Sequence, residues 1–170
     1  MTELDIRPAN PSDARDLAII HVDSWRAAYA GIVPEAKLNS LSHDKREKSF
    51  HSSISDGPEE TWIAEQGDKP VGFATIGPCR DEDTAPSVTG EIWGIYLRPC
   101  NRRAGIGSHL CSYVEKLLAV RGYKTIKLWV LRDNSSARRF YEHMGYETDG
   151  TEQVLNIGKP LTAVRYEKRV

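Results

Sequence analysis

The chain has 170 residues, and its 23 lysines and arginines against 24 acidic residues give a formal net charge of −1. This length predicts a single domain over residues 1–170 with a substantial core. The near-neutral charge argues against a general nucleic-acid binder, whose domain is normally basic. No apolar run approaches transmembrane length and the polar N-terminus lacks a signal-peptide core, so we expect neither a nucleic-acid nor a membrane partner.

The cysteines and histidines predict neither disulfides nor a metal site. Cys79, Cys100 and Cys111 form no C-x-x-C pair and are typical of free thiols in a reducing cytoplasm. The five histidines show no metal-ligand spacing. We therefore expect a cytoplasmic protein without a metal.

The first half of the chain predicts a strand, three helices and a hairpin. Residues 4–7 alternate as a strand does, and a helix follows in which Ser12 or Asp13 is the N-cap and Gly31 and Pro34 mark the end. Next come helices over 34–41 and 45–54, the latter capped by Ser42 or Asp44, and a hairpin of strands over 61–65 and 71–76.

After a polar loop over 77–90, strands and helices alternate. The predicted elements are a strand over 91–98, a helix over 105–121, a strand over 125–131, a helix over 134–143 and strands over 146–151 and 163–168. This order predicts an α/β fold, a mixed sheet with helices on both faces.

The turn that starts the helix over 105–121 has the features of a phosphate-binding loop. Gly105 and Gly107 remove side chains where a phosphate would approach the backbone, and Arg102 and Arg103 supply fixed cations. The first amides of a helix lack intrahelical partners and lie at the positive end of its dipole. The turn is not a P-loop, because no lysine follows the second glycine, and a dinucleotide fingerprint would need a third glycine.

Two motifs carry a resemblance to a known family. The pattern R-x-x-G-x-G over residues 102–107 resembles the pyrophosphate loop of the GNAT superfamily of acyl-CoA-dependent N-acetyltransferases. The superfamily's second segment, N-x-x-A-x-x-x-Y-x-x-x-G-[FY], is matched at Asn134, Ala137, Tyr141, Gly145 and Tyr146. The motifs stand in the family's order, and the resemblance extends over residues 60–148 and, more loosely, over the first half.

The resemblance implies a mostly antiparallel sheet of six to seven strands whose central pair, beginning at Glu91 and ending at Leu131, splays apart. The pantetheine arm of acetyl-CoA would lie in this V, beside Ile95, Tyr96 and Leu97. Its pyrophosphate would meet the backbone amides of Arg102, Arg103, Ala104, Gly105, Ile106, Gly107 and Ser108. The second segment would add contacts from Asn134, Ala137 and Tyr141. Most members carry glycine where Arg103 stands, so either the loop holds phosphate differently or Arg103 reaches the adenosine phosphate.

The implied reaction is attack of an amine on the acetyl-CoA thioester. Presenting a lysine-like amine in its neutral form costs roughly 4 kcal/mol at neutral pH, which a general base relieves. Glu91, eleven residues before Arg102, stands where lysine-acetylating members carry that base. A surface glutamate, with a water chain as the base, is the alternative. Tyr141 is implied as the general acid for the CoA sulfur, and simple packing is its alternative.

The acceptor site is less defined. Trp25 and Tyr29, at i and i+4, share one helix face and would either line the acceptor cleft or pack on the sheet. A small-molecule or protein amine remains open as the acceptor, including a peptide N-terminus, a polyamine, an aminoglycoside-like antibiotic or an amino acid. Homodimers are common in the superfamily. A non-catalytic acyl-CoA sensor is the second hypothesis, and a toxin that acetylates charged tRNA is disfavoured by the balanced charge.

Overall fold

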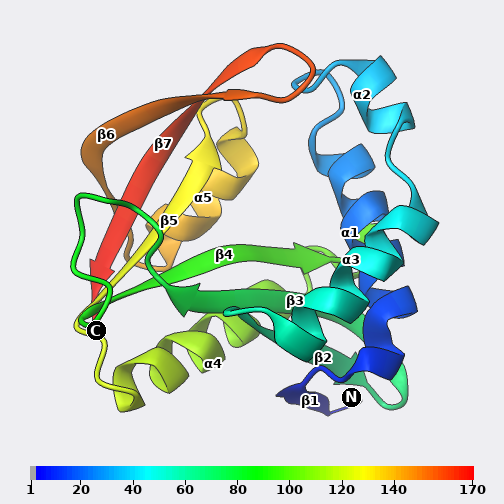
Figure 1. Cartoon of the computed structure of the whole chain (residues 1–170), viewed down its shortest axis with the longest axis horizontal. Helices are drawn as coiled ribbons and strands as arrows, with labels where there is room; N and C mark the ends of the chain where they lie inside the picture. The colour runs from blue at the N-terminus through cyan, green and yellow to red at the C-terminus, as the bar shows by residue number, and fades with distance from the viewer. Residues whose placement is uncertain (1–2) are drawn as a thin grey trace.

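The computed structural model describes residues 3–170 as a seven-stranded sheet flanked by helices (Figure 1). The strand order is β1-β2-β3-β4-β5-β7-β6, and every neighbouring pair is antiparallel except β4 and β5. The strands are β1 (Leu4–Pro8), β2 (Glu60–Gln66), β3 (Lys69–Pro78), β4 (Thr89–Leu97), β5 (Thr125–Leu131), β6 (Glu147–Asn156) and β7 (Pro160–Arg169). The predicted mixed, mostly antiparallel sheet is confirmed.

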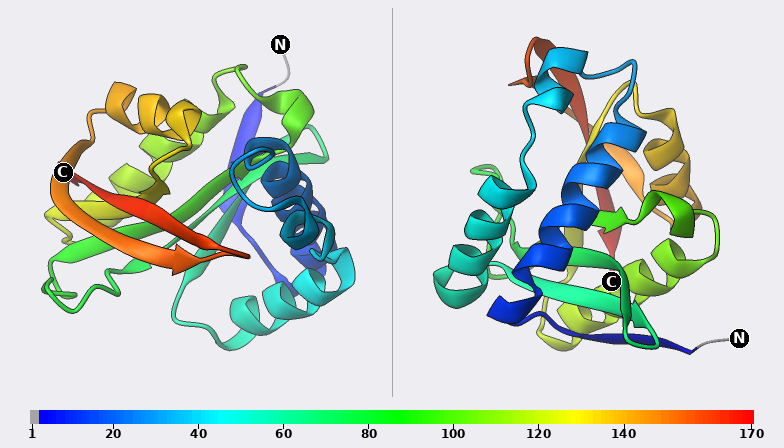
Figure 2. Two further views of the ribbon diagram at one scale, coloured as in Figure 1. Left: turned by 90° about the horizontal axis from the view of Figure 1, so that it is seen from above. Right: turned by 90° about the vertical axis from the view of Figure 1, so that its right-hand side faces the viewer.

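Helices cover both faces of this sheet, as predicted. They are α1 (Ala14–Ala28), α2 (Glu35–Asn39), α3 (His43–Asp56), α4 (Ile106–Val120) and α5 (Ser135–His143). Figure 2 shows α4 and α5 on one side of the sheet and α1 to α3 on the other. None of the helices within residues 3–170 is long and apolar enough to cross a membrane.

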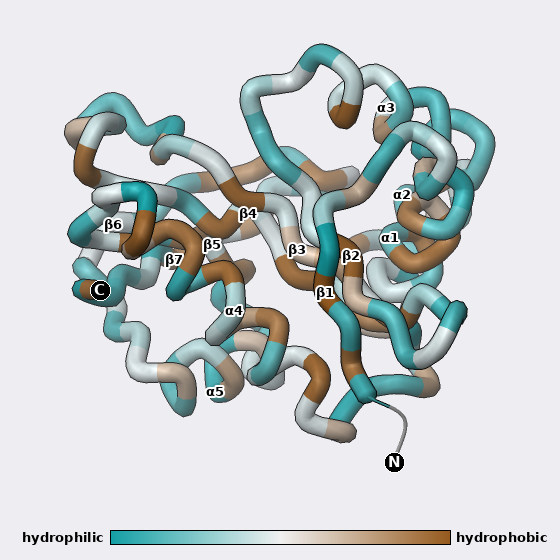
Figure 3. Tube along the Cα trace, turned by 90° about the horizontal axis from the view of Figure 1, so that it is seen from below, coloured by the Kyte–Doolittle hydropathy of each residue, from teal (hydrophilic) through white to brown (hydrophobic). Residues whose placement is uncertain are grey.

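Periodic apolar residues explain why these helices dock. In α4, Ile106, Leu110, Val114 and Leu118 recur every four residues and are buried against the central strands. The main core lies between α4, α5 and the sheet, and a second core lies between α1, α3 and the strands β2 and β3. Figure 3 shows apolar residues along the central strands and at intervals along α1 and α4.

The structure corrects several predicted boundaries. The residue that caps the first helical turn is Asn10, which accepts from the Ser12 amide while Asp13 accepts from the Asn10 amide. Asp13, one of the two predicted alternatives, is the N-cap residue of α1, but its side chain accepts from the Asn10 amide of the preceding 3-10 turn (Pro11–Asp13) and not from the free amides of α1. The last two strands are also longer than predicted, because they form one hairpin that turns at residues 157–159.

The central strand pair splays apart, which also confirms a prediction. β4 pairs with β5 only from Thr89 to Glu91, and β5 then continues along β7. Figure 1 shows β4 and β5 meeting at their first residues and diverging beyond them. The part of β4 after Glu91 therefore has one edge without a neighbouring strand.

Candidate active site

The loop before α4 has the backbone geometry that an anion site requires. Arg103 and Gly105 both adopt left-handed conformations, with φ of 63° and 77°, and α4 begins at Ile106. Successive amides in such a loop converge on one point and form a nest for an anion. The first helical hydrogen bond runs from the His109 amide to the Gly105 carbonyl at 3.1 Å, so the amides of residues 106–108 have no partner within the helix.

Arg103 occupies a position that favours glycine. Arg103 is the one non-glycine residue within 3–170 that has a positive φ. For a residue with a Cβ this conformation costs roughly 1–2 kcal/mol. This cost explains why the family that the motif resembles usually carries glycine at this position. The side chains of Arg102 and Arg103 are both exposed at the loop surface, where they can approach phosphate oxygens.

The open edge of β4 presents the backbone groups of alternate residues to the gap between the diverging strands β4 and β5. The Arg98 amide donates to the Val71 carbonyl of β3, so Tyr96, two residues earlier, also directs its backbone toward β3. Ile95 and Leu97 therefore direct their N–H and C=O groups toward the open edge. A pantetheine arm lying there would pair with these two residues, while Tyr96 would contribute its side chain.

The second motif forms α5 beside this edge. Asn134 is the N-cap of α5, and its side-chain oxygen accepts from the Ala137 amide at 3.2 Å. Tyr141 is buried and packs edge-on against Phe140 and Tyr146. Burial raises the pKa of the Tyr141 hydroxyl well above its usual value, so the hydroxyl carries its proton at neutral pH.

A cavity of about 470 Å³ lies where β4 and β5 diverge. Its aromatic lining consists of Trp25, Tyr29, Trp93, Tyr96 and Trp129. Its charged lining consists of Arg80, Asp81 and Glu91. The volume and the aromatic wall with a few charged groups are those of a small-molecule site.

The structure thus brings Trp25, Tyr29, Tyr96 and Glu91 together, and Tyr141 stands outside this lining. Trp25 and Tyr29 contact each other edge-on, with ring centroids 4.7 Å apart. Both also pack against the small apolar cluster under α2, so they line the cavity and support the core at once.

A bulge in β4 makes this lining. Trp93 has no partner on β3, because Thr75 pairs with Gly94 and Ile76 pairs with Ile92. One extra residue reverses the alternation of side chains beyond it. Glu91 and Tyr96, which would lie on opposite faces of a regular strand, therefore both reach the cavity. Sequence periodicity alone could not show this; the signal that could have is Gly94 beside the bulge, since an isolated glycine within a strand often marks one.

Glu91 is 1% exposed and is held by Arg80. Its Oε2 accepts from the Arg80 amide and Nε, both at 3.0 Å, and its Oε1 accepts from Nη2 at 2.7 Å. The Arg80 guanidinium also lies over the Trp93 ring, 3.8 Å from its centroid. A carboxylate offers about four lone-pair positions, so one remains on Oε1. The sequence analysis did not predict Arg80, which sits in a polar loop without any motif.

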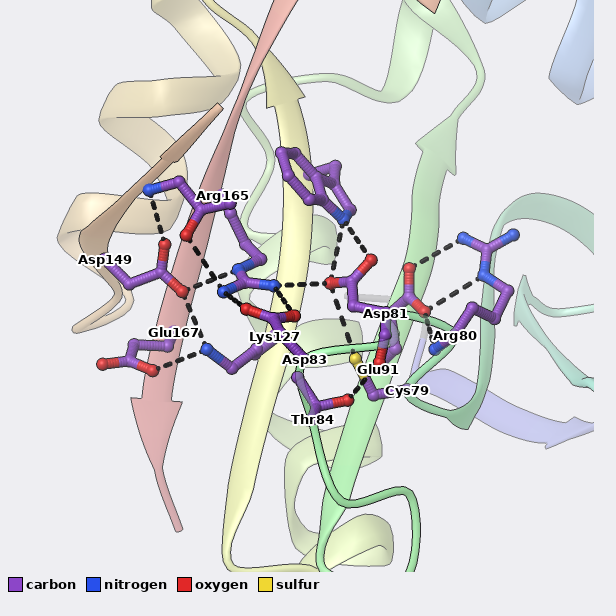
Figure 4. Close-up of polar contacts among 12 residues, drawn as sticks. Cys79, Arg80, Asp81, Asp83, Thr84, Glu91, Lys127, Asp149, Arg165 and Glu167 are labelled. Carbon is purple, nitrogen blue, oxygen red and sulfur yellow. Dashed lines mark hydrogen bonds and ion pairs between the residues drawn. The ribbon is translucent and has the colours of Figure 1, made fainter. Parts of the chain in front are cut away.

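A cluster of charges fixes the β3–β4 loop next to the cavity (Figure 4). Arg165 of β7 donates to Asp81 at 3.1 Å, to Asp83 at 2.7 Å and to Asp149 at 2.7 Å. Trp129 also donates to Asp81, at 3.1 Å. This cluster was missed too, because its members lie up to 84 residues apart and only the fold brings them together.

The comparison with known families decides the class. Residues 22–146 match the family model described as Acetyltransferase (GNAT) family. The chain belongs to the GNAT acetyltransferase family. It is therefore an acyl-CoA-dependent acetyltransferase, as the two motifs predicted.

Relatives of this GNAT acetyltransferase and solved structures similar to it agree with this assignment. The uncharacterized N-acetyltransferase YuaI of Bacillus subtilis is 34% identical over 164 residues, which cover 96% of this chain and 88% of that protein. The PaiA N-acetyltransferase of Thermoplasma acidophilum, solved with coenzyme A, has a TM-score of 0.79 at 24% identity over 99% of both chains. A GCN5-related N-acetyltransferase of Rhodopseudomonas palustris has a TM-score of 0.79 at 26% identity, covering 100% of this chain and 98% of that one.

The features of this GNAT acetyltransferase fit acetyl-CoA. The left-handed loop before α4 suits a pyrophosphate, and the open edge of β4 offers hydrogen-bonding groups to an extended amide chain. No group of three or more His, Cys, Asp or Glu side chains within residues 3–170 could hold a metal ion.

Proposed function

We propose that the protein transfers the acetyl group of acetyl-CoA to a primary amine by direct attack, with Glu91 as general base and Tyr141 as general acid. The observation that carries this proposal is the buried Glu91 carboxylate in the cavity wall, at the residue where β4 leaves β5. An amine in the cavity would meet this carboxylate on one side and the open edge of β4 on the other.

The cofactor contacts follow from the backbone. Of the predicted amides, those of residues 103–108 would hold the pyrophosphate, while the Arg102 amide donates to the Pro99 carbonyl at 3.4 Å. The Arg102 and Arg103 side chains would add charge-assisted hydrogen bonds of roughly 1.5–3 kcal/mol each. Ile95 and Leu97 would pair with the pantetheine amides. Asn134, whose oxygen already caps α5, would offer its amide N–H groups.

Each proton has a destination in this arrangement. The acceptor ammonium would give its proton to the remaining lone pair on Glu91 Oε1, directly or through a water molecule. When bound, acetyl-CoA supplies the thioester, whose carbon–sulfur bond breaks as the acceptor nitrogen bonds to the acetyl carbon. The Tyr141 hydroxyl, protonated because burial raises its pKa, would then give a proton to the departing sulfur. The second proton, which the nitrogen loses as the amide forms, would pass through water to the Tyr141 oxygen and restore its hydroxyl, while Glu91 returns its proton to solvent. Trp25 and Tyr29 would shield the acceptor from water.

Replacing Glu91 tests the base. Glu91→Gln keeps the shape but removes the proton acceptor, so we expect turnover at neutral pH to fall at least tenfold while acetyl-CoA still raises the melting temperature. The surface variant Glu60→Gln serves as the control. Turnover equal to wild type across the pH range would remove Glu91 from the mechanism.

Tyr141→Phe tests the acid. We expect turnover to fall more than cofactor affinity, since the ring remains and only the donor is lost. A loss of CoA binding with turnover unchanged at saturation would instead assign Tyr141 to packing against Phe140 and Tyr146.

The wider organisation also belongs to this proposal. We expect the whole chain to act as one acetyltransferase domain in the cytoplasm, where its three free cysteines would stay reduced, and to tolerate homodimer formation. Thiol release from acetyl-CoA with a panel of amines separates an enzyme from a sensor. Binding of acetyl-CoA without thiol release from any amine would favour the non-catalytic acyl-CoA-binding alternative.

A further inference from the structure

We propose that the acceptor is an α-amino acid with an apolar or aromatic side chain, and that Arg80 and Glu91 together bind its charged headgroup. This inference rests on the proposed function, since it names the substrate of the same site. Arg80 would take the carboxylate of the acceptor, while Glu91 would take the ammonium group that is acetylated.

Arg80 keeps donors free on the cavity side. Its amide, Nε and Nη2 are bound to Glu91, but Nη1 has no hydrogen-bond partner within residues 3–170. Stacking on Trp93 and the two-point contact with Glu91 fix the plane of the guanidinium. The side chain is nevertheless 53% exposed and lines the cavity. A fixed guanidinium with a free edge is the arrangement that recognises a planar carboxylate.

The other charges of the lining are already satisfied. Both oxygens of Asp81 accept from Trp129, and one also accepts from Arg165. Glu91 has a single lone-pair position left, on Oε1. The charge of Asp81 is thus paired with Arg165 and that of Glu91 with Arg80, so within the described lining no carboxylate lacks a cationic partner. This charge balance favours an acceptor with one ammonium and one carboxylate over a polyamine.

The spacing of the free groups matches an α-amino acid. Glu91 Oε1 accepts from Arg80 Nη2 at 2.7 Å, and the free donors are on Nη1, the neighbouring nitrogen of the same guanidinium, so a ligand that engages Oε1 and Nη1 must carry opposite charges on adjacent groups. The ammonium and carboxylate of an α-amino acid are attached to the same carbon. Around them, Trp25, Tyr29 and Trp129 form an aromatic wall that would cover an apolar side chain.

Matched pairs of acceptors test the proposal on the full-length protein with acetyl-CoA. We would compare kcat/KM for L-tryptophan with tryptamine and for L-phenylalanine with phenethylamine, each pair differing only in the carboxylate, and include spermidine. We expect wild type to prefer the carboxylate-bearing member roughly ten- to hundredfold. In Arg80→Gln this ratio should fall toward one, while the surface variant Arg121→Gln should keep it.

The ratio separates recognition from support of Glu91. If Arg80 only positions Glu91, Arg80→Gln lowers kcat/KM for both members equally and leaves the ratio unchanged, which would overturn the proposal. A wild-type preference for tryptamine, phenethylamine or spermidine would also overturn it, while leaving N-acetyltransfer intact.

Calorimetric titration of L-tryptophan and tryptamine into the protein with CoA gives a second readout. Binding of tryptophan that Arg80→Gln abolishes would support the headgroup site even if no acetyl transfer occurred. In that case only the proposed function would fail.

Discussion

Replacing Arg165 should lower the stability of the fold more than most other single substitutions. Arg165 is 4% exposed and bridges three carboxylates from the β3–β4 loop and the β6–β7 hairpin. Removing one partner of a buried charge pair typically costs 3–5 kcal/mol, because the remaining charge stays buried without compensation. Asp149 would keep Lys127, and Asp81 would keep Trp129, which places the cost of Arg165→Met at the lower end, about 3 kcal/mol.

The pH dependence gives an independent measure. Burial alone would raise the pKa of Asp149, but hydrogen bonds from Lys127, the Thr151 amide and Arg165 lower it from 3.8 to about 2. This shift corresponds to about 2 kcal/mol. Because the folded-state pKa lies below the unfolded one, this contribution is complete above about pH 4 and is lost as the pH falls toward 2. The stability difference between wild type and Arg165→Met should narrow over the same interval.

Urea denaturation at pH 7 and at intervals down to pH 2 measures both effects. A loss of about 3 kcal/mol should lower the melting temperature by about 6–12 °C in a chain of this size. Arg132→Met is the matched control, since its exposed pair with Glu152 should contribute less than about 1 kcal/mol. If Arg165→Met costs no more than this control, or if its deficit is independent of pH, the buried-charge reasoning is wrong.

Three further predictions concern single residues. Burial lowers the pKa of His21 from 6.5 to about 3, so its contribution to the free energy of unfolding is complete above pH 6.5 and falls by about 1.4 kcal/mol per pH unit below it. In urea titrations at a series of pH values, His21→Leu should remove this decrease of the unfolding free energy below pH 6.5. Arg103→Gly should relieve the strain of the left-handed backbone and stabilise the fold by at most about 1 kcal/mol, yet raise the Kd for acetyl-CoA about tenfold. Arg103→Ala should lose the same affinity for acetyl-CoA without any increase in stability. Asn134→Ala should cost about 1 kcal/mol through its lost cap, whereas Asn134→Asp should keep the cap and weaken only acetyl-CoA binding; unchanged affinity in that variant would limit Asn134 to capping.

The sequence predicted the fold well because its signals are local. The spacing of apolar residues in α4 and the glycines around it mark the helix and its ends, and Gly122 indeed adopts a left-handed φ of 97° after the last turn. The order of elements then leaves few arrangements of the sheet. Boundaries were less accurate where caps depend on context, as at Asn10, whose role requires the backbone turn that follows it.

The candidate site was only half predictable. Glu91, Trp25 and Tyr29 could be singled out because they stand at fixed distances from a motif or from each other. Arg80 and Asp81 could not, because they lie in a loop whose position depends on Arg165, 84 residues beyond Asp81. Even the side of β4 on which Glu91 and Tyr96 meet depends on a bulge, and its local signal, the isolated Gly94, does not fix which residue is the extra one.

The short contact between β4 and β5 has a consequence for the lifetime of the protein. The sheet consists of two halves that share only three register pairs, and the amides along the open edge have no strand to protect them from exchange with solvent. A cofactor that pairs with this edge would act as a missing strand and tie the halves together. At a hundred times its Kd it would add about 2.7 kcal/mol to the stability of the fold. Resistance to proteolysis would then rise and fall with the supply of acetyl-CoA, and an enzyme starved of its donor would be the first to be degraded.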